Sequence, residues 1–393
     1  MISNRPIRLR SLTLVSGLLL GIAPFAAHAQ QATPAAANAP GAIDVVASGL
    51  TNPRGFTWDA DGVLYVTLAG TGGSNLPTEN VPIIEAFGGF YGGPSASVVR
   101  IVDGCPVTVA DGLPSFVDGT GAAIGVSSVA ILDGQLYATV DGGGTVHGNP
   151  DQPVGLYRIN ADGTFAVVAD LSAWMRANPV AERPAADNDP DGEVWRLLPT
   201  ADGRAFWVIE TNQGQVLQIT PEGAITRIAD LSAGHPVPTG IALAPDGGVY
   251  VGNLTPFPYP DGAARVIHVA PDGTVTDYWT GLTAVVALAM GPDDTLYALE
   301  MATGSIDEDP FVLPNSGRIV RYAGPESQDV VAEGLNFPVA YAFGADEALY
   351  VASPSMGATP GTAVITRLEL TGQATAPAAT PAATGQCFAA PVS

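Results

Sequence analysis

Three oxygen-bearing side chains recur at one position of a repeated strand and are the sharpest candidates for chemistry in this sequence. Glu210, Asn253 and Glu300 each stand three residues after an aromatic residue, in "WVIE", "YVGN" and "YALE". If the strands are neighbours, the oxygens converge at one end of the sheet assembly. Ca²⁺ and similar divalent ions take such donors. The alternative is that these side chains cap strand ends through hydrogen bonds to adjacent loops.

A second oxygen-rich segment lies just before the first of these strands. The segment "ADNDPDGE" places Asp187, Asp189 and Asp191 before Gly192, as in the opening of a DxDxDG calcium loop. The full motif needs an acidic residue at loop position twelve, where Leu198 stands. The pattern predicts either a calcium site built on half of the motif or a solvated acidic turn. Ca²⁺ or another divalent cation is the only cofactor indicated.

Histidine offers the candidates for proton transfer. His147 and His235 lie in loop-like segments and could act as general bases near neutral pH, or could be ordinary surface residues. His268 lies within an expected strand and is interpreted as structural. The chain has no Lys, which excludes Schiff-base chemistry. No catalytic residue is assigned, and whether the protein is an enzyme stays open.

A basic side chain and four aromatic ones could face a ligand. Arg54, in "NPRG", could bind an anionic ligand or pair with one of the many acids. Phe90 and Tyr91 in "EAFGGFYGG", with Phe257 and Tyr259 in "TPFPYPDG", predict a hydrophobic lid or ligand platform. The alternative is that these rings pack loops onto the scaffold.

The first 29 residues are typical of a secretory signal peptide. Arg5, Arg8 and Arg10 precede an apolar run over residues 12–25, and the small residues of "AHA" end at Ala29. The run is short for a membrane-spanning helix. We expect cleavage near Ala29 and a secreted or periplasmic mature chain that is not inserted in a membrane.

The net charge of the chain limits the classes of partner that it can bind. The formal net charge is −23, and loss of the three signal-peptide Arg makes it more negative. Nucleic acid and anionic membrane surfaces need a basic face and are therefore excluded as partners. A small molecule or an extracytoplasmic protein remains, and we expect a monomer.

Internal repeats define the elements that must position these residues. One sequence pattern occurs six times. It consists of an apolar strand, a turn rich in Asp and Gly, and a strand centred on an aromatic residue. Asp-Gly turns between such strands are strong hairpin signals. Two further strands follow each copy, which predicts an all-β, six-bladed β-propeller with four antiparallel strands per blade. The aromatic anchors are Tyr65, Tyr137, Trp207, Tyr250, Tyr297 and Tyr350.

The two ends of the repeat region predict how the ring closes. Residues 43–50, "IDVVASGL", resemble the fourth strands of other copies, whereas the last copy ends after its third strand at 363–370. The N-terminal strand should complete blade six and remove an open sheet edge. The propeller then spans residues 43–370, between a linker at 30–42 and an Ala/Pro/Thr-rich tail at 371–393.

Propeller geometry separates the connections into two faces. The connections between strands two and three and between blades share one face, and in this sequence they are the long and individual ones. Long loops on a rigid scaffold usually carry function, so we place the site on this face, at the mouth of the central channel. The segments concerned are 68–96, 141–153, 171–192, 252–263 and 301–316.

The segment "PTGIALAPDGGVYVGNLTPFPYPDGAARV" resembles the ScyD/ScyE family of exported propellers, and "GLTNPRGFTWDADGVLYVT" and "GLNFPVAYAFGADEALYVAS" are similar to its first and last repeats. The resemblance covers about residues 43–370. The "PDGxLYV" pieces are shared with NHL and gluconolactonase-like propellers. The first long loop departs from the family because it contains no Cys. The resemblance implies the fold and export, and it implies no reaction.

The two cysteines are placed by this topology. Cys105 lies in the turn between strands three and four of blade one, and the chain leaves blade six near Leu370 on the same face. The extended tail from Leu370 to Cys387 can reach the neighbouring blade. An exported protein meets an oxidising compartment. We therefore expect a Cys105–Cys387 disulfide, with free or intermolecular thiols as the alternative.

Two functions remain open at this stage. The first is a binding or scaffold protein for a small molecule or partner at the channel mouth. The second is a metal-dependent hydrolase of the gluconolactonase-like type, with Glu210, Asn253 and Glu300 as metal ligands. A tightly bound divalent ion at the channel mouth would distinguish them.

Overall fold

Tight Asp-Gly turns set the strand lengths of this chain. The turn glycines Gly62, Gly163, Gly247 and Gly273 have φ between 79° and 85°, a conformation that residues with a Cβ rarely adopt. Aspartates close the same turns, as where Val63 donates its backbone N–H to the side chain of Asp59 at 2.8 Å. Such turns favour antiparallel neighbours.

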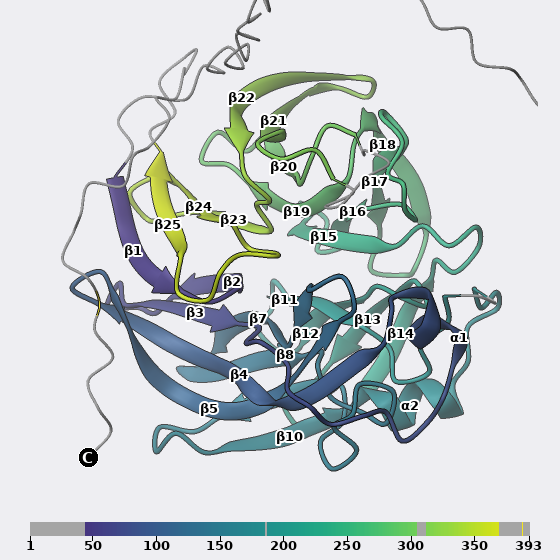
Figure 1. The fold of residues 1–393 in the computed structure, drawn as a ribbon. Helices are drawn as coiled ribbons and strands as arrows, with labels where there is room; N and C mark the ends of the chain where they lie inside the picture. The colour runs from purple at the N-terminus through teal and green to yellow at the C-terminus, as the bar shows by residue number, and fades with distance from the viewer. Residues whose placement is uncertain (1–43, 185–186, 305–311, 369–386, 388–393) are drawn as a thin grey trace, which may run out of the picture. The chain divides into compact units, whose positions relative to one another are not determined.

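The structure is a computed structural model that describes residues 44–184, 187–304, 312–368 and 387. These residues form six antiparallel sheets around a central axis (Figure 1). The innermost strands contact one another in a closed ring, in the order β2, β7, β11, β15, β19, β23 and back to β2. The predicted six-bladed β-propeller is confirmed. The predicted signal peptide, linker and most of the tail lie outside the described residues.

The blades take their strands in chain order from the axis outward, apart from the last. Blade one contains β2 (Pro53–Trp58), β3 (Leu64–Leu68), β4 (Phe90–Val102), β5 (Cys105–Asp118) and β6 (Ala123–Ile124). Blade two contains β7 (Val126–Leu132), β8 (Gln135–Val140), β9 (Gly155–Ile159) and β10 (Phe165–Asp170). Blade three contains β11 (Val194–Pro199), β12 (Phe206–Glu210), β13 (Gln215–Ile219) and β14 (Ile225–Asp230).

The second half of the ring repeats the plan. Blade four contains β15 (Pro238–Leu243), β16 (Val249–Asn253), β17 (Ala264–Val269) and β18 (Val275–Leu282). Blade five contains β19 (Val285–Met290), β20 (Leu296–Glu300), β21 (Gly317–Gly324) and β22 (Ser327–Leu335). Blade six contains β23 (Ala340–Phe343), β24 (Leu349–Ser353), β25 (Ala363–Leu368) and β1 (Asp44–Leu50). All six aromatic anchors lie on second strands, as the repeats predicted.

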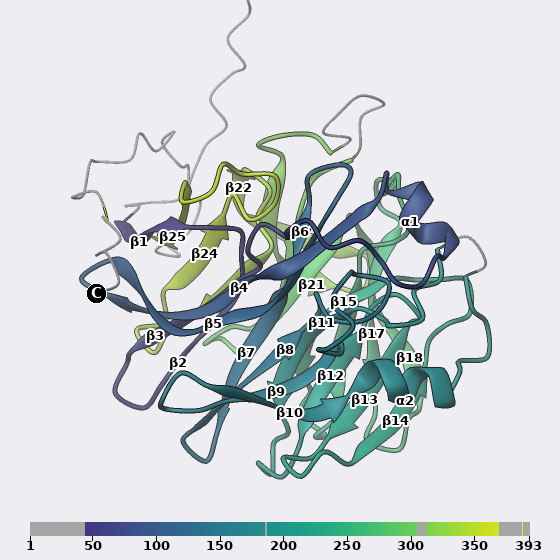
Figure 2. The same ribbon diagram turned by 60° about the horizontal axis from the view of Figure 1, so that its bottom comes forward.

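Blade one departs from the four-stranded plan. The two-residue β6 pairs with β5 and adds a fifth strand. Residues 90–96, expected within a loop, instead begin the long β4, where Phe90 pairs with Asp118 of β5. The buried rings of Phe90 and Phe116 pack at 4.7 Å between centroids and hold this extension. Figure 2 shows the long strands β4 and β5 side by side. Two short helices, α1 (Pro82–Ala86) and α2 (Leu171–Ala177), lie in the connections.

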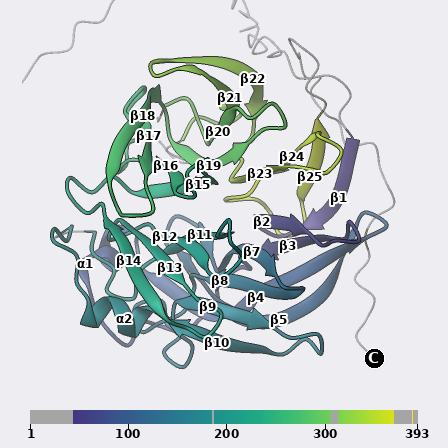
Figure 3. The same ribbon diagram turned by 180° about the vertical axis from the view of Figure 1, so that it is seen from behind.

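The ring closes through the N-terminal strand. β1 pairs antiparallel with β25, and the pairing runs from Asp44 opposite Arg367 to Leu50 opposite Ala363. The side chain of Leu50 is fully buried in this seam. β1 and β25 lie side by side in both Figures 1 and 3. The predicted closure is confirmed.

The predicted disulfide is also present. Cys105, at the start of β5 in blade one, is bonded to Cys387 of the tail. Cys387 lies against Gly49 of β1, so the bond fastens the tail across the seam between blades six and one.

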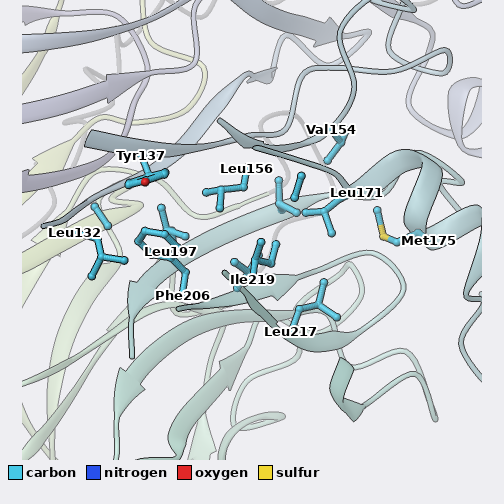
Figure 4. Packing of buried hydrophobic residues seen from close by; sticks show 14 residues of the cluster. Leu132, Tyr137, Val154, Leu156, Leu171, Met175, Leu197, Phe206, Leu217 and Ile219 are labelled. Atoms are coloured by element: carbon cyan, nitrogen blue, oxygen red, sulfur yellow. The ribbon is translucent and has the colours of Figure 1, made fainter. Parts of the chain in front are cut away.

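The core between blades two and three supports the longest interblade connection. Leu171 and Met175 of α2 are fully buried among strand residues of both blades. Figure 4 shows them beside Val154 and above Leu217 and Ile219. Asp170 begins the helix by accepting the N–H of Ala173 at 2.8 Å, a standard N-cap. This helix fixes the start of the segment that carries Asp187 to Glu193.

Candidate functional site

Four connections meet on the face opposite the hairpin turns. They are the β8–β9 loop (141–154), the crossing into blade three (178–193), the crossing into blade four (231–237) and the β16–β17 loop (254–263). Hydrogen bonds and ion pairs link the first three, and they involve the histidines and aspartates singled out in the sequence. The expected site face is therefore where these candidates gather.

His147 and Asp189 form a fully buried pair. Nε2 of His147 lies 2.6 Å from Oδ2 of Asp189, and Nδ1 lies 2.5 Å from the carbonyl oxygen of Gly143. The imidazole stacks on Phe116 at 4.1 Å between centroids. Neither side chain reaches solvent. This contact joins the β8–β9 loop to the crossing, and it leaves His147 no accessible nitrogen for substrate.

Asp191 and Asp187 have different partners. Asp191 accepts the backbone N–H of Val146 at 2.7 Å and pairs with Arg176 of α2 at 2.9 Å. Asp187 lies 2.9 Å from Nε2 of His235 at a partly exposed position. The three aspartates of the DxDxDG-like segment thus hold three different neighbours. Their hydrogen bonds fit a loop-fastening role better than a shared cation.

Glu210, Asn253 and Glu300 occupy equivalent places, as the repeat predicted. Each ends the second strand of its blade and pairs with the first residue of the innermost strand. Glu210 accepts the N–H of Glu193 at 3.2 Å, and Glu300 accepts the N–H of Thr283 at 2.6 Å. The side chains therefore tie each strand end to the preceding interblade crossing.

The same side chains also reach the third strand of their own blade. Glu210 accepts from Gln215 at 3.2 Å, and Asn253 accepts the N–H of Arg265 at 2.7 Å. The buried side chain of Glu300 forms an ion pair with the partly exposed Arg318. The oxygens are of the type that Ca²⁺ prefers, but hydrogen bonds inside the blades already use them. As placed, the donor set does not fit a common ion, and we derive no metal-dependent step.

Among the described residues, no cluster of three or more His, Cys, Asp or Glu side chains is arranged to hold a metal ion. The divalent cation stays a prediction.

Glu193 is the functional candidate that the sequence did not single out. It directly precedes β11 and is partly exposed. Burial raises its pKa well above the ordinary value, and the negative charges of Asp141, Asp189, Asp187 and Glu210 raise it further. A carboxyl group with a strongly raised pKa is a recognised mark of a candidate functional site.

Tyr259, in the β16–β17 loop, lies close enough to Glu193 and Asp187 for their charges to act on it. Burial raises its pKa to about 12, and the charges of Glu193 and Asp187 add to the effect. We call Asp187, Glu193, His235 and Tyr259 the acidic mouth site. All four residues are partly exposed.

The other expected ligand-face residues divide into two groups. Phe90 is buried against Phe116 and His147, so it packs a loop, as the alternative interpretation held. Tyr91 and Phe257 are exposed, and Phe257 packs edge-on against Tyr259 at 5.5 Å.

Arg54 lies too deep to meet a ligand at the surface. It is 2% exposed, and it donates to the carbonyl oxygen of Ala123. Its guanidinium lies 5.7 Å from the ring of Trp195, which is itself partly exposed. Burial lowers the pKa of Arg54 to about 10, although Asp141 and Asp118 favour its charged form. Arg54 and Trp195 therefore belong to the hub of the channel.

Two pockets lie elsewhere on the propeller. One of about 280 Å³ follows the seam beside Ser48 and Cys387. The other, of about 220 Å³, lies between blades three and four and includes Leu231, Asn253 and Arg265. Neither pocket includes a residue of the acidic mouth site. The acidic mouth site is therefore defined by the charge and the exposure of its four residues.

No helix among the described residues has the length and apolar character needed to cross a membrane.

Comparison with known proteins establishes the fold class. No protein-family profile matches the chain, and no curated protein matches it in sequence. Solved six-bladed propellers are similar in structure. One is a putative oxidoreductase (glucose dehydrogenase) from Thermus thermophilus, with a TM-score of 0.54 at 16% identity over 84% of this chain and 99% of that one.

Two further structures match to a similar degree. Regucalcin from Agrobacterium tumefaciens, described as a calcium-binding protein, gives a TM-score of 0.51 at 14% identity, covering 84% of this chain and 94% of that chain. A glucose dehydrogenase gives a TM-score of 0.51 at 13% sequence identity, and the match covers 84% of this chain and 99% of that chain. At these identities the likeness extends to the fold alone.

Proposed function

We propose that this protein is an exported β-propeller that binds a polar small molecule at the acidic mouth site. The observation that carries the proposal is Glu193, a partly exposed residue whose carboxyl has its pKa raised by burial and by four neighbouring acids. Such a group holds its proton to a higher pH than an ordinary glutamate does, and the protonated form can donate as well as accept a hydrogen bond. Tyr259 and the Asp187–His235 pair supply further polar contacts.

The charge of the site selects the ligand class. Asp187 lies at the mouth beside Glu193. The whole chain carries a formal net charge of −23. This field repels anions and attracts cations. We therefore expect a neutral ligand rich in hydroxyl groups or a cationic one, with a carboxylate ligand disfavoured.

Export is part of the proposal. It is supported by the signal-like pattern of residues 1–29 and by the Cys105–Cys387 disulfide, which suits an oxidising compartment. Membership of the ScyD/ScyE-like propellers is proposed on the sequence segments given above. An extracytoplasmic protein partner on the same face is the competing form of this binding function.

A thermal-shift screen with three ligand groups tests the proposal: neutral polyols, organic amines and carboxylates. We expect stabilising hits among the first two groups. Binding should weaken at least about tenfold in Glu193→Ala and Tyr259→Phe, which corresponds to about 1.4 kcal/mol. Glu222→Ala, on an exposed hairpin turn, is the matched control and should bind as the parent does. Equal binding by Glu193→Ala and the parent would contradict the site.

A metal-dependent hydrolase of the gluconolactonase-like type is the second candidate. The shared register of Glu210, Asn253 and Glu300 favours it. Regucalcin, described as calcium-binding, has a similar fold. The hydrogen bonds of these side chains weigh against it, because a cation would have to displace Arg318 from Glu300. Metal analysis distinguishes the two functions.

A further inference from the structure

The innermost strands of the propeller share an irregularity that aims backbone groups at the channel. In blades one to five the pairing between strands one and two skips one residue. In blade six, Val339 stands at the corresponding place before Ala340, which pairs with Ala352. We call the residues at this position the six bulge residues, although a register shift is recorded only for the first five: Arg54, Ser127, Trp195, Thr239, Val286 and Val339. A bulge leaves its backbone groups without a partner in the sheet.

The residue that follows the bulge residue is small in every blade except blade three. The five small residues are Gly55, Ser128, Gly240, Ala287 and Ala340. Blade three carries Arg196, whose side chain is 8% exposed. The hub is tightly packed, since a Cβ on Gly55 would lie 3.0 Å from the carbonyl oxygen of Ser127. A single long side chain thus extends into a ring of short ones.

The guanidinium of Arg196 binds five of the six bulge carbonyls. Nη1 donates to the carbonyl oxygens of Arg54 at 3.0 Å and Trp195 at 3.3 Å, with a longer contact to Ser127 at 3.4 Å. Nη2 donates to those of Val286 at 3.2 Å and Val339 at 2.5 Å. These acceptors come from blades one, two, three, five and six. One side chain therefore links nearly the whole ring at its axis.

Neighbouring groups reinforce this arrangement. The ring of Trp195 lies 5.5 Å from the Arg196 guanidinium, a cation–π distance, and its Nε1 donates to the carbonyl oxygen of Val286 at 3.2 Å. Burial and the nearby charge of Arg54 lower the pKa of Arg196 to about 9, so the side chain remains charged at neutral pH. Buried carbonyls need donors, and a charged donor forms the stronger hydrogen bonds.

We propose that the bulge carbonyls form a cation-binding ring in the central channel, and that this chain fills the ring with its own Arg196. The ring is matched to a planar monovalent cation with several N–H donors, that is, to a guanidinium ion. A ring of backbone carbonyls is a known way to replace the hydration water around a cation.

Chemical rescue tests the proposal. Arg196→Ala should lower the melting temperature, and millimolar guanidinium chloride should raise it again by about 2 °C or more. Urea has the same shape without the charge and should give no rescue, and neither should NaCl at equal ionic strength. In the parent protein the ring is filled, so guanidinium should give no stabilisation.

Arg227→Ala is the matched control. Arg227 also lies over an indole, at 5.3 Å from Trp174, and also donates to a backbone carbonyl, that of Pro179, but it does so at the surface. Its variant should show no rescue. Rescue of Arg196→Ala by urea or NaCl as large as that by guanidinium, or an Arg196→Ala variant as stable as the parent, would overturn the proposal.

A second pair of variants covers the case in which Arg196→Ala does not fold. Arg196→Lys keeps a charged donor and Arg196→Met keeps only the apolar stem. The proposal expects Lys to be the more stable of the two. A Met variant at least as stable as the Lys variant would show that the ring does not require a cation.

Discussion

The imidazole of His147 faces two acceptors, the carboxylate of Asp189 and the carbonyl oxygen of Gly143. Both ring nitrogens must therefore carry a hydrogen, and His147 is a cation at neutral pH. Burial alone would lower its pKa, but Asp189, together with the charges of Asp141 and Asp191, outweighs burial and raises the pKa to about 9. We interpret the pair as a buried fastener between two loops of the site face.

We expect His147→Gln to destabilise the fold by about 3 kcal/mol or more, because it leaves Asp189 as a buried charge without its partner. His268→Gln is the control, since His268 pairs with Asp246 at a partly exposed surface position. That change should cost about 1 kcal/mol or less. Urea unfolding of both variants measures the difference. Similar losses in the two would argue against a buried ionic fastener.

The stability of the fold should fall as pH rises from about 5 to about 9. Burial raises the pKa of Asp141 to about 8 and that of Glu210 to about 7. The neighbouring aspartates raise the pKa of His147 to about 9. In each case the folded state binds the proton more tightly than the unfolded chain, so unfolding becomes easier as the proton is lost. Unfolding free energy measured across this range checks the sign. A rise toward pH 9 would contradict these protonation states.

Removal of residues 44–50 should cause aggregation or a large loss of stability. The deletion leaves β25 with an open edge and removes the fully buried Leu50. Deletion of residues 31–42 is the control and should have little effect. Thermal melts and size-exclusion profiles of both proteins test the closure. A β1 deletion that melts like the control would mean that the strand does not close the ring.

Loss of the Cys105–Cys387 bond should lower stability by about 2–4 kcal/mol, since it constrains a loop of 282 residues in the unfolded chain. The Cys105→Ser/Cys387→Ser double variant, unfolded in parallel with the parent, gives the value. The parent in reductant should approach the variant. If reductant lowers the stability of the double variant as well, the effect does not come from this bond.

Removal of divalent metal should change the melting temperature little, because Glu210, Asn253 and Glu300 form hydrogen bonds within their blades. We expect melting temperatures in EDTA and in Ca²⁺ to agree within about 2 °C. Elemental analysis of the dialysed protein checks the same point. One equivalent of bound metal that is lost in Glu300→Gln would instead support the hydrolase function.

The repeats predicted the fold because each signal was local or periodic. The aromatic anchors, the Asp-Gly turns and the strand-like residues 43–50 all act through neighbours in sequence. The disulfide followed once the ring order was known. The extension of blade one was missed because "FYGG" in β4 contains glycines that are typical of a loop, and only the partner strand shows its pairing.

The site was predicted less well, for a physical reason. The register of Glu210, Asn253 and Glu300 was right, but their partners, such as Arg318, come from strands aligned only in three dimensions. Glu193 and Arg196 were missed because the repeats were compared at the second strand. At the corresponding first-strand positions the other five repeats carry no charged residue, so a full alignment of the repeats would have found both.

A crystal structure with the strongest ligand from the screen tests the central claim most directly. The account predicts ligand density at the acidic mouth site, within hydrogen-bonding distance of Glu193 and Tyr259. Three results would contradict the account. They are ligand density in the pocket between blades three and four, ligand density on the face that carries the hairpin turns, and ligand density on a metal ion held by Glu210, Asn253 and Glu300.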